Sequence, residues 1–344
     1  MRSLRAYWSL LSVLLAAVGC RGLEARTQSK VYLHPSPVED RGPLAEMAVQ
    51  LPWSESPQKI ALIDVDGLLV NTPITGLGSV GENPTAVFRE KLDRVEADAC
   101  FRAVVLRINS PGGGVTAADI MWRDLRTMKV RRGIPVVACL MDLGTGGAYY
   151  LATAADQIVA HPTTITGGMG VILNLYNLRD AMMQFNILGA PIKAGQYTDL
   201  GSPIRELDDQ GRALLQQIAD QYHARFREVV RMTRPQHDPA RQEDFDGRVF
   251  LAQEALERGL IDAIGYLDDA IALARRMAHA PQAKVVVLHR SHDAARSVYA
   301  VTPNQPVQTN LFPLSIPGFD RSQLPTFLYI WQPEPTLERR AAGR

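Results

Sequence analysis

The sequence predicts an α/β fold, built from parallel β-sheet units with flanking helices and present in a single copy. Two apolar runs rich in valine, isoleucine and leucine, at 103–108 and 135–141, each end in a glycine-rich turn. A short buried strand that runs into such a turn and then into a helix is one unit of a parallel sheet. No internal repeat is visible in the 344 residues, so we expect one α/β domain with appendages.

The first half of the domain alternates strands and helices. The first strand is expected at 59–67, and a helix at 84–98 has apolar side chains at helical spacing. Strand 103–108 follows, then helix 116–126 and strand 135–141. This order is typical of consecutive strand–helix units in one sheet.

Beyond the second glycine-rich turn the sheet is expected to continue through 156–172. Threonines in this stretch favour a strand, and its glycines permit close backbone packing. A helix is predicted at 177–188, where we interpret Met182, Met183 and Phe185 as packing residues.

The strongest helical pattern in the chain lies at 208–231. Its apolar stripe predicts packing against the sheet or against a neighbouring subunit. Two further helices, at 251–258 and 267–278, lead to a strand at 284–288.

Four regions are expected along the chain. Residues 1–20 form a signal peptide, 21–58 a linker, 59–280 the main domain, and 281–344 a C-terminal strand with a proline-rich tail. At residues 325–331 the tail contains the segment PTFLYIW, which is more aromatic than a solvated tail usually is. We therefore expect the tail to dock on its own domain or on a neighbour.

The N-terminus has the features of a bacterial export signal. Arg2 and Arg5 precede an apolar core at 8–18, which is about half the ~20 residues needed to span a bilayer. The core ends in small residues followed by Cys20, which resembles a lipoprotein signal with Cys20 as the lipidated residue. The alternatives are ordinary cleavage nearby or an uncleaved anchor. We expect a membrane-anchored lipoprotein facing the periplasm, and Arg21 favours the outer membrane.

Composition narrows the possible partners. The net charge of +1 gives no reason to expect a nucleic-acid partner, and three cysteines argue against a disulfide framework. Cys139 lies in an apolar strand and is expected in the core. Asp64 and Asp66 share one strand face, and we favour a solvent-exposed strand end over a metal site. No cofactor and no metal are predicted.

Several ordered motifs resemble the signal peptide peptidase A family, which is peptidase family S49. They are RINSPGG at 107–113, YYLATAAD at 149–156, PTTITGGMGVI at 162–172, DGRVF at 246–250 and GLID at 259–262. The resemblance covers roughly residues 59 to 274. It implies a ClpP/crotonase-like fold, an oligomeric assembly and a Ser/Lys endopeptidase that clears membrane-associated peptides.

The resemblance also implies an oxyanion hole at the two glycine-rich turns. Gly112 and Gly113 in the first turn, with Gly147 in the second, would offer backbone N–H groups to a carbonyl oxygen. This function needs no side chain. The alternative is that these glycines only allow the chain to turn.

The two catalytic positions of the family are substituted. Its nucleophilic serine stands directly before Gly-Gly-Tyr-Tyr, and this chain has Gly146 at that place. Its general-base lysine stands a few residues before Ser-Pro, and Thr198 occupies that place. Both members of the dyad are therefore predicted to be missing.

Thr145 is a possible substitute nucleophile. A shift of one position along a strand or turn redirects the side chain, and a β-branched threonine is stiff at χ1. A hydroxyl also needs a base within hydrogen-bond reach. Lys193 could be such a base, but it lies five residues before Thr198. In a regular strand this odd offset puts it on the opposite face from position 198.

Three functions compete. The first is a catalytically impaired family member that binds peptides or signal-peptide remnants, or that serves as a structural subunit in a homo-oligomer or with an active relative. The second is an active serine/threonine-type endopeptidase that uses Thr145. The third is a crotonase-like acyl-transfer enzyme, which the detailed motifs favour least.

Overall fold

The structure is a computed structural model, and it describes residues 42–50, 56–73, 75–76, 79–80, 82–290, 297–298 and 327–331. Its main sheet has the strand order β1-β11-β2-β5-β6-β7-β10, with β8, β9 and β12 attached at the side. The predicted signal peptide with Cys20 and most of the tail lie outside the described residues. Within the described ranges, none of the helices is both long enough and apolar enough to cross a membrane.

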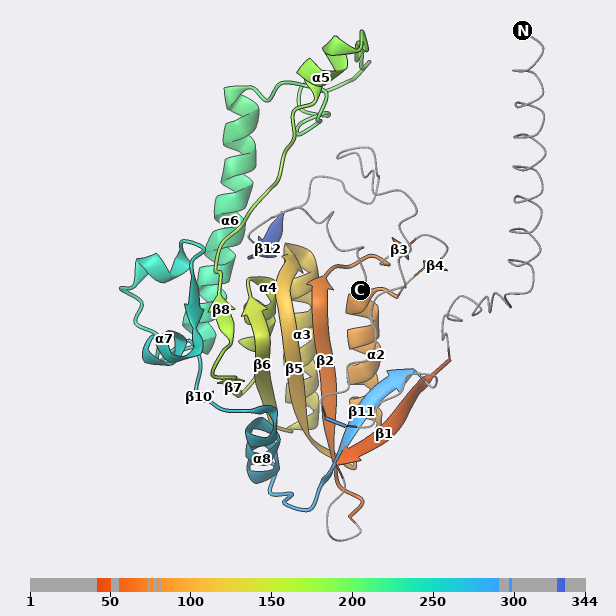
Figure 1. Ribbon diagram of the computed structural model, residues 1–344, viewed down its shortest axis with the longest axis vertical. Helices are drawn as coiled ribbons and strands as arrows, with labels where there is room; N and C mark the ends of the chain where they lie inside the picture. Colours follow the sequence, from red (N-terminus) through yellow and green to blue (C-terminus); the bar gives the residue numbers. More distant parts are fainter. Residues whose placement is uncertain are drawn as a thin grey trace, which may run out of the picture. The chain divides into compact units, whose positions relative to one another are not determined.

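Four parallel strands form the centre of the sheet (Figure 1). They are β2 (Lys59–Leu69), β5 (Phe101–Gly114), β6 (Val136–Thr145) and β7 (Gln157–Ala160). These ranges confirm the predicted strands at 59–67, 103–108 and 135–141. The expected α/β class with parallel strand units is thus confirmed.

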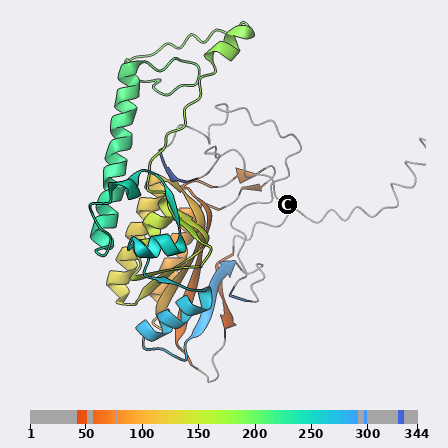
Figure 2. The same cartoon turned by 60° about the vertical axis from the view of Figure 1, so that its left-hand side comes forward.

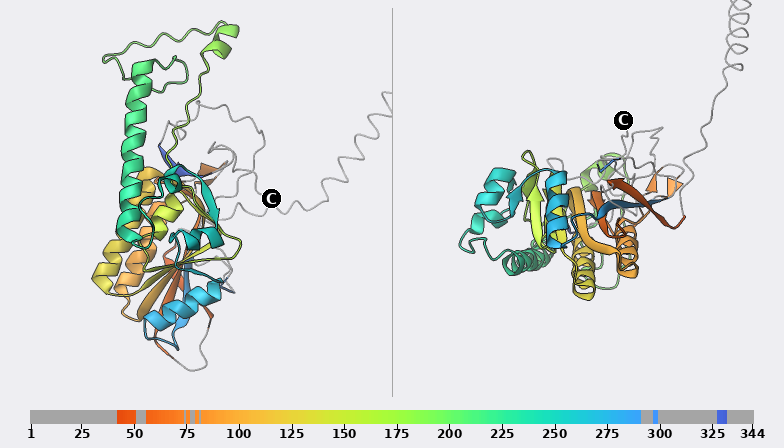
Figure 3. Two further views of the ribbon diagram at one scale, coloured as in Figure 1. Left: turned by 90° about the vertical axis from the view of Figure 1, so that its left-hand side faces the viewer. Right: turned by 90° about the horizontal axis from the view of Figure 1, so that it is seen from below.

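Successive residues of the strands enter two separate cores, because side chains alternate across a sheet. In β2, Ala61 and Ile63 face one core, whereas Ile60 and Leu62 face the other. The first core is covered by α2 (Pro84–Ala97) and α3 (Val115–Arg132), and the second by α8 (Leu267–Met277). Figure 3 shows the sheet edge-on between these helices.

The strand β6 leads directly into the short helix α4 (Gly147–Ala152), all of which is buried. On the same side of the molecule, β8 (Ile165–Gly167) pairs with β6 and with the antiparallel β9 (Val249–Leu251). The remaining small elements are the 3-10 helix at Gln242–Phe245, α7 (Ala252–Glu257), β10 (Ala263–Ile264), and a separate hairpin of β3 (Thr75–Gly76) and β4 (Ser79–Val80).

Residues 173–208 form an arm that carries α5 (Arg179–Gln184) and leads into the long helix α6 (Asp209–Thr233) (Figure 2). The long helix is as predicted. The helix expected at 177–188 is only six residues long, and the packing role given to Met183 and Phe185 is wrong within this chain. Their exposed fractions are 49% and 75%, because no other described element covers this part of the arm.

Two strands extend the sheet beyond its expected limits. β1 (Leu44–Gln50) pairs antiparallel with β11 (Lys284–Arg290), and β11 pairs parallel with β2. The linker expected at 21–58 therefore contains a strand, and the domain continues past residue 280. Because β1 lies at the sheet edge and pairs with a strand some 240 residues away in sequence, no local pattern indicates it.

The acidic pair on β2 also differs from expectation. Asp64 is not at a solvent-exposed strand end but forms an ion pair with Arg107 of β5, with 2.5 Å between Arg107 Nη2 and the carboxylate. Both side chains are 5% exposed. The two residues are direct neighbours in the β2–β5 register, which places the opposite charges together.

The chain returns to the glycine-rich turns at its C-terminal end. β12 (Leu328–Ile330) pairs antiparallel with residues Gly112–Gly114 at the end of β5. Figure 1 shows β12 in blue above the end of β5. The tail thus docks on its own domain through this strand.

Candidate functional site

The two glycine-rich turns lie side by side because β5 and β6 are adjacent and parallel. Their register pairs Ser110 with Gly144, so both strands end at the same edge of the sheet. This carboxyl edge is where α/β proteins place their ligands. The first turn is held by the Ser110 hydroxyl, which accepts a hydrogen bond of 3.1 Å from the N–H of Gly112.

Gly146 forms the sharp turn between β6 and α4. Its φ and ψ are 54° and −122°, a combination that residues with a side chain rarely adopt. Its N–H donates to the carbonyl of Gly167 at 2.9 Å, and its own carbonyl accepts from Tyr150 at 2.9 Å. A strained strand-to-helix turn of this kind presents the nucleophile in α/β-hydrolases. In this chain the same type of turn carries no side chain.

A side chain at position 146 would point at the peptide bond between Tyr329 and Ile330. A Cβ atom built on Gly146 would lie 2.4 Å from the oxygen and 2.7 Å from the carbon of the Tyr329 carbonyl, and 3.0 Å from the nitrogen of Ile330. The two distances to the carbonyl are too short for a real Cβ. The turn and β12 can therefore coexist as they do only because residue 146 is glycine.

The glycines predicted for an oxyanion hole surround the same carbonyl. A Cβ on Gly112 would lie 2.1 Å from the Tyr329 oxygen, and one on Gly147 would lie 3.3 Å from it. Gly113 is the β-ladder partner of Tyr329. Phe327 is hydrogen-bonded to Val115, and Trp331 to Pro111, so hydrogen-bonded pairs lie two residues to either side of the Tyr329–Gly113 pair. Hydrogen-bonded pairs occur at every second position of an antiparallel ladder, and the Tyr329–Gly113 pair is therefore also of the hydrogen-bonded type.

The side chain of Tyr329 fills an aromatic pocket. Its ring stacks on Tyr150 with centroids 5.5 Å apart and lies 4.7 Å from Phe226, and its hydroxyl donates to the carbonyl of Tyr222 at 2.6 Å. The Tyr150 hydroxyl donates to Asp119. Burial raises the pKa of both phenols far above the ordinary value, with the Asp119 carboxylate adding to the effect. Neither tyrosine supplies a base at neutral pH.

Thr145 is the last residue of β6 and is fully buried. Its hydroxyl has no hydrogen-bond partner within the described part of the chain. Its Cβ lies 3.3 Å from the place where a Cβ on Gly168 would be. A general base would be hydrogen-bonded to this hydroxyl, and none of the described residues is.

Thr198 lies in the arm and is exposed. Its hydroxyl donates to the carbonyls of Ala194 and Gly195, at 2.8 and 3.1 Å. Lys193 is held in the same loop by an ion pair of 2.5 Å with Asp199, and this pairing lowers the pKa of Asp199. The structure thus brings Gly112, Gly113, Gly146 and Gly147 together, with Thr145 next to them. Among the described residues, the hydrogen bonds of the Thr198 side chain stay within its own loop.

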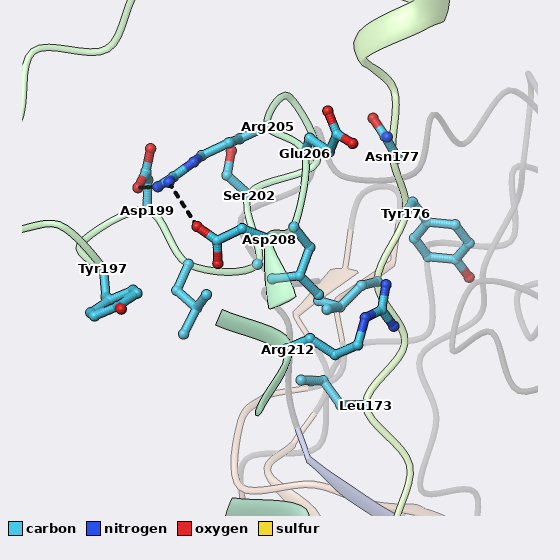
Figure 4. A pocket seen from close by; sticks show the side chains of 14 residues that line it. Leu173, Tyr176, Asn177, Tyr197, Asp199, Ser202, Arg205, Glu206, Asp208 and Arg212 are labelled. Carbon is cyan, nitrogen blue, oxygen red and sulfur yellow. Dashed lines mark hydrogen bonds and ion pairs between the residues drawn. The ribbon is translucent and has the colours of Figure 1, made fainter. Parts of the chain in front are cut away.

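A pocket of about 470 Å³ lies in the arm, between residues 173–177 and 197–212 (Figure 4). Arg205 crosses it with an ion pair of 2.6 Å to Asp199 and a longer one of 3.6 Å to Asp208. None of the glycine-rich turn residues lines this pocket. Among the residues with described positions, no group of three or more His, Cys, Asp or Glu side chains is placed to hold a metal ion.

Reasoning from the sequence did not identify the Tyr329–Ile330 peptide bond or the aromatic pocket as parts of the site. The aromatic segment at the end of the tail was a signal for docking, but not for the place where it docks. That place depends on a β-ladder between residues more than 200 positions apart.

The profile of peptidase family S49 matches residues 128–280. The putative protease slr0021 of Synechocystis is 32% identical over 193 residues, which cover 56% of this chain and 69% of the relative. The putative signal peptide peptidase SppA of Enterococcus faecium is 29% identical over 63% of this chain and 62% of its own length. The chloroplastic serine protease SPPA of Arabidopsis thaliana is 34% identical over 58% of this chain, but only 29% of the relative is covered.

Solved structures give weaker similarity. The 1510-N membrane-bound stomatin-specific protease has a TM-score of 0.46 at 14% sequence identity, over 69% of this chain and all of that one. A ClpP1 from Listeria monocytogenes has a TM-score of 0.40 at 12% identity, over 61% of this chain and 94% of that one. The sequence relatives and the family profile carry the assignment: the chain belongs to peptidase family S49.

Proposed function

We propose that this chain is a catalytically impaired member of the S49 family that holds an extended peptide at its glycine-rich turns. It would act as a peptide-binding or structural subunit in the proteolysis of membrane-associated peptides. The observation that carries this proposal is Gly146, which occupies the sharp strand-to-helix turn without a nucleophilic side chain.

The expected loss of activity follows from what remains. Where a catalytic serine has been removed from a serine protease, the oxyanion hole and substrate binding still accelerate the reaction by about 10³–10⁴ over water. Enzymes with complete catalytic groups accelerate their reactions by about 10⁶–10¹⁷-fold over the uncatalysed reaction. Backbone N–H groups at Gly113 and Gly147 would therefore support binding of a peptide carbonyl with little turnover.

The alternative of an active peptidase rests on Thr145, whose hydroxyl is buried beside the turn without a described partner. For this alternative, a base from outside the described contacts would have to reach Thr145. Its full burial argues against access by such a base or by substrate.

The proposed setting is the periplasmic side of a bacterial membrane, with anchoring through a lipid on Cys20. The N-terminal sequence supports export, and the Enterococcus faecium relative is named as a putative signal peptide peptidase. Assembly with further copies or with an active relative is supported by the arm, which exposes Phe185, Leu188 and Ile192.

Labelling with a fluorophosphonate probe tests the proposal. The full chain would be compared with Thr145→Ala and with Gly146→Ser/Thr198→Lys, with an active serine peptidase labelled in parallel. We expect no labelling of the wild type. Labelling of the wild type that disappears in Thr145→Ala would overturn the proposal and make Thr145 the nucleophile. Because a side chain at 146 would overlap the Tyr329 carbonyl, labelling that occurs only in the double variant would show that the turn accepts a reactive side chain once β12 has moved aside.

A further inference from the structure

We infer that residues 327–331 are a built-in ligand of the peptide groove, an intramolecular peptide seated where an added extended peptide would bind. This inference rests on the proposed function, because it assigns the occupant of the same glycine-rich turns. It also gives the chemistry of the groove's ligand: an extended peptide with a backbone carbonyl against the Gly146 turn and an aromatic side chain in the pocket of Tyr150 and Phe226.

Backbone hydrogen bonds hold the segment on both of its edges. On one edge the carbonyl of Phe327 accepts from Val115 at 3.2 Å, and the N–H of Trp331 donates to Pro111 at 3.1 Å. On the other edge Leu328 donates to and accepts from Ile172, at 2.9 and 3.0 Å. A peptide inserted as a strand between two backbone segments is a common mode of peptide recognition, in which main-chain bonds provide affinity.

Specificity in this mode comes from pockets for alternate side chains. Tyr329 is fully buried among Tyr150, Phe226 and Tyr222, and its hydroxyl has a partner at the carbonyl of Tyr222. Phe327, two residues earlier on the same face, lies 5.3 Å from the ring of Tyr222. The pocket therefore selects tyrosine or phenylalanine at the central position.

The register of the segment matches that of a peptide presented for cleavage. The three atoms nearest to a Cβ on Gly146 are the carbonyl oxygen and carbon of Tyr329 and the nitrogen of Ile330. These are the atoms of a single peptide bond, and its carbonyl oxygen lies against Gly112 and Gly147. The built-in ligand thus blocks the place that a peptide from solution would need.

Displacement by a free peptide should be difficult. A segment tethered to its own binding site has an effective concentration on the order of millimolar. A free peptide of equal affinity must reach similar concentrations to compete. The groove of the wild-type chain should therefore be closed to peptides at micromolar concentration, and its proposed role in peptide binding would require a local peptide concentration on the order of millimolar.

The first test measures binding of a fluorescein-labelled synthetic peptide with the sequence of residues 323–335, by fluorescence anisotropy with the full chain. We expect no saturation with the wild type or with Tyr329→Phe at micromolar concentrations. Tyr329→Ala, which empties the pocket and weakens the built-in strand, should bind the peptide at least about ten-fold more tightly. A peptide with alanine in place of its tyrosine should not bind. Equal behaviour of the wild type and Tyr329→Ala, including no binding to either, would overturn the inference.

The second test measures hydrogen exchange of the amides of Leu328 and Trp331. Both should be protected in the wild type and exchange at least about ten-fold faster in Gly146→Ala, whose new Cβ would overlap the Tyr329 carbonyl. Two variants are matched controls. Gly133→Ala also replaces a glycine with positive φ but has no atom within 4 Å of the new Cβ, and Gly114→Ala lies in the same turn with its nearest contact at 3.7 Å. Both controls should keep the protection.

The outcomes separate this inference from the proposed function. Probe labelling of the wild type would overturn the proposed loss of catalysis, whether or not the amides of β12 are protected from hydrogen exchange. If the wild type is not labelled but the amides of Leu328 and Trp331 exchange without protection, only the inference of a built-in ligand is overturned. If Gly146→Ala does not fold, the comparison of Tyr329→Ala with Tyr329→Phe still decides the question.

Discussion

At the scale of single residues, the site is defined by positions where a β-carbon does not fit. Gly112 and Gly146 face the Tyr329 carbonyl, and Gly113 faces the backbone of Leu69. Gly114 belongs to the same turn but has only ordinary contacts. The glycines of one motif therefore have different roles, which the motif itself does not reveal.

Replacing Gly113 by alanine should destabilise the fold much more than replacing Gly114. The new Cβ on Gly113 would lie 2.1 Å from the carbonyl oxygen of Leu69, so the β2–β5 pairing must shift. We expect Gly113→Ala to lower the free energy of unfolding by about 1–3 kcal/mol, and Gly114→Ala to change it by about 0.5 kcal/mol or less. Urea denaturation of both variants measures this. Equal losses would show that the close approach of β2 is not the reason for glycine at 113.

At the scale of elements, one lysine joins three pieces of the fold. Lys59 at the start of β2 forms ion pairs of 2.6 Å with Glu46 of β1 and of 2.7 Å with Asp98, which directly follows α2. The edge strand β1, which the sequence did not indicate, is thus tied to the centre of the sheet by charge as well as by its ladder with β11.

This tie should make stability depend on pH in the acid range. The hydrogen bond from Lys59, with a further one from the N–H of Cys100, lowers the pKa of Asp98 to about 2. The unfolded value is near 3.9, so between these values the unfolded state binds more protons than the folded state. The stabilisation is present above about pH 4 and is lost as the pH falls towards 2. Melting temperatures measured from pH 5 to 2 should fall less steeply for Asp98→Asn than for the wild type; parallel curves would rule out this contribution.

At the scale of the whole molecule, the apolar surface is distributed unevenly. Phe226, Val229 and Val230 at the end of α6 are buried, whereas Leu214 and Ile218 near its start are 38% and 36% exposed. The arm before α6 exposes further apolar side chains. Exposed apolar side chains concentrated in one part of a chain are typical of an interface with another chain.

Charges on the arm should weaken assembly if the arm joins subunits. We expect Phe185→Asp/Leu188→Asp to lower the mass of the purified full chain measured by light scattering in detergent. Val130→Asp is the matched control, because Val130 is 84% exposed but lies on α3, outside the arm. An unchanged mass in the double variant, or an equal decrease in the control, would contradict a role of the arm in assembly.

The sequence predicted the parts of this molecule whose signals are local. Apolar runs ending in glycine located β2, β5 and β6, and helical spacing located α2 and α6. The β1 strand and the place where Tyr329 docks depend on pairing with residues more than 200 positions away, and no local pattern encodes such a partner. Asp64 was misjudged for the same reason, because its partner Arg107 lies on a different strand.

The turn at Gly146 also has a consequence for fold stability. In a sparsely populated region of φ and ψ, a residue with a side chain costs about 1–3 kcal/mol, and an enzyme that keeps its nucleophile there must accept that cost. Glycine adopts the same conformation without the steric penalty. Under the proposed function, a glycine at the place of the nucleophile would spare this chain that steric cost, which lies on the stability side of the trade-off between stability and activity.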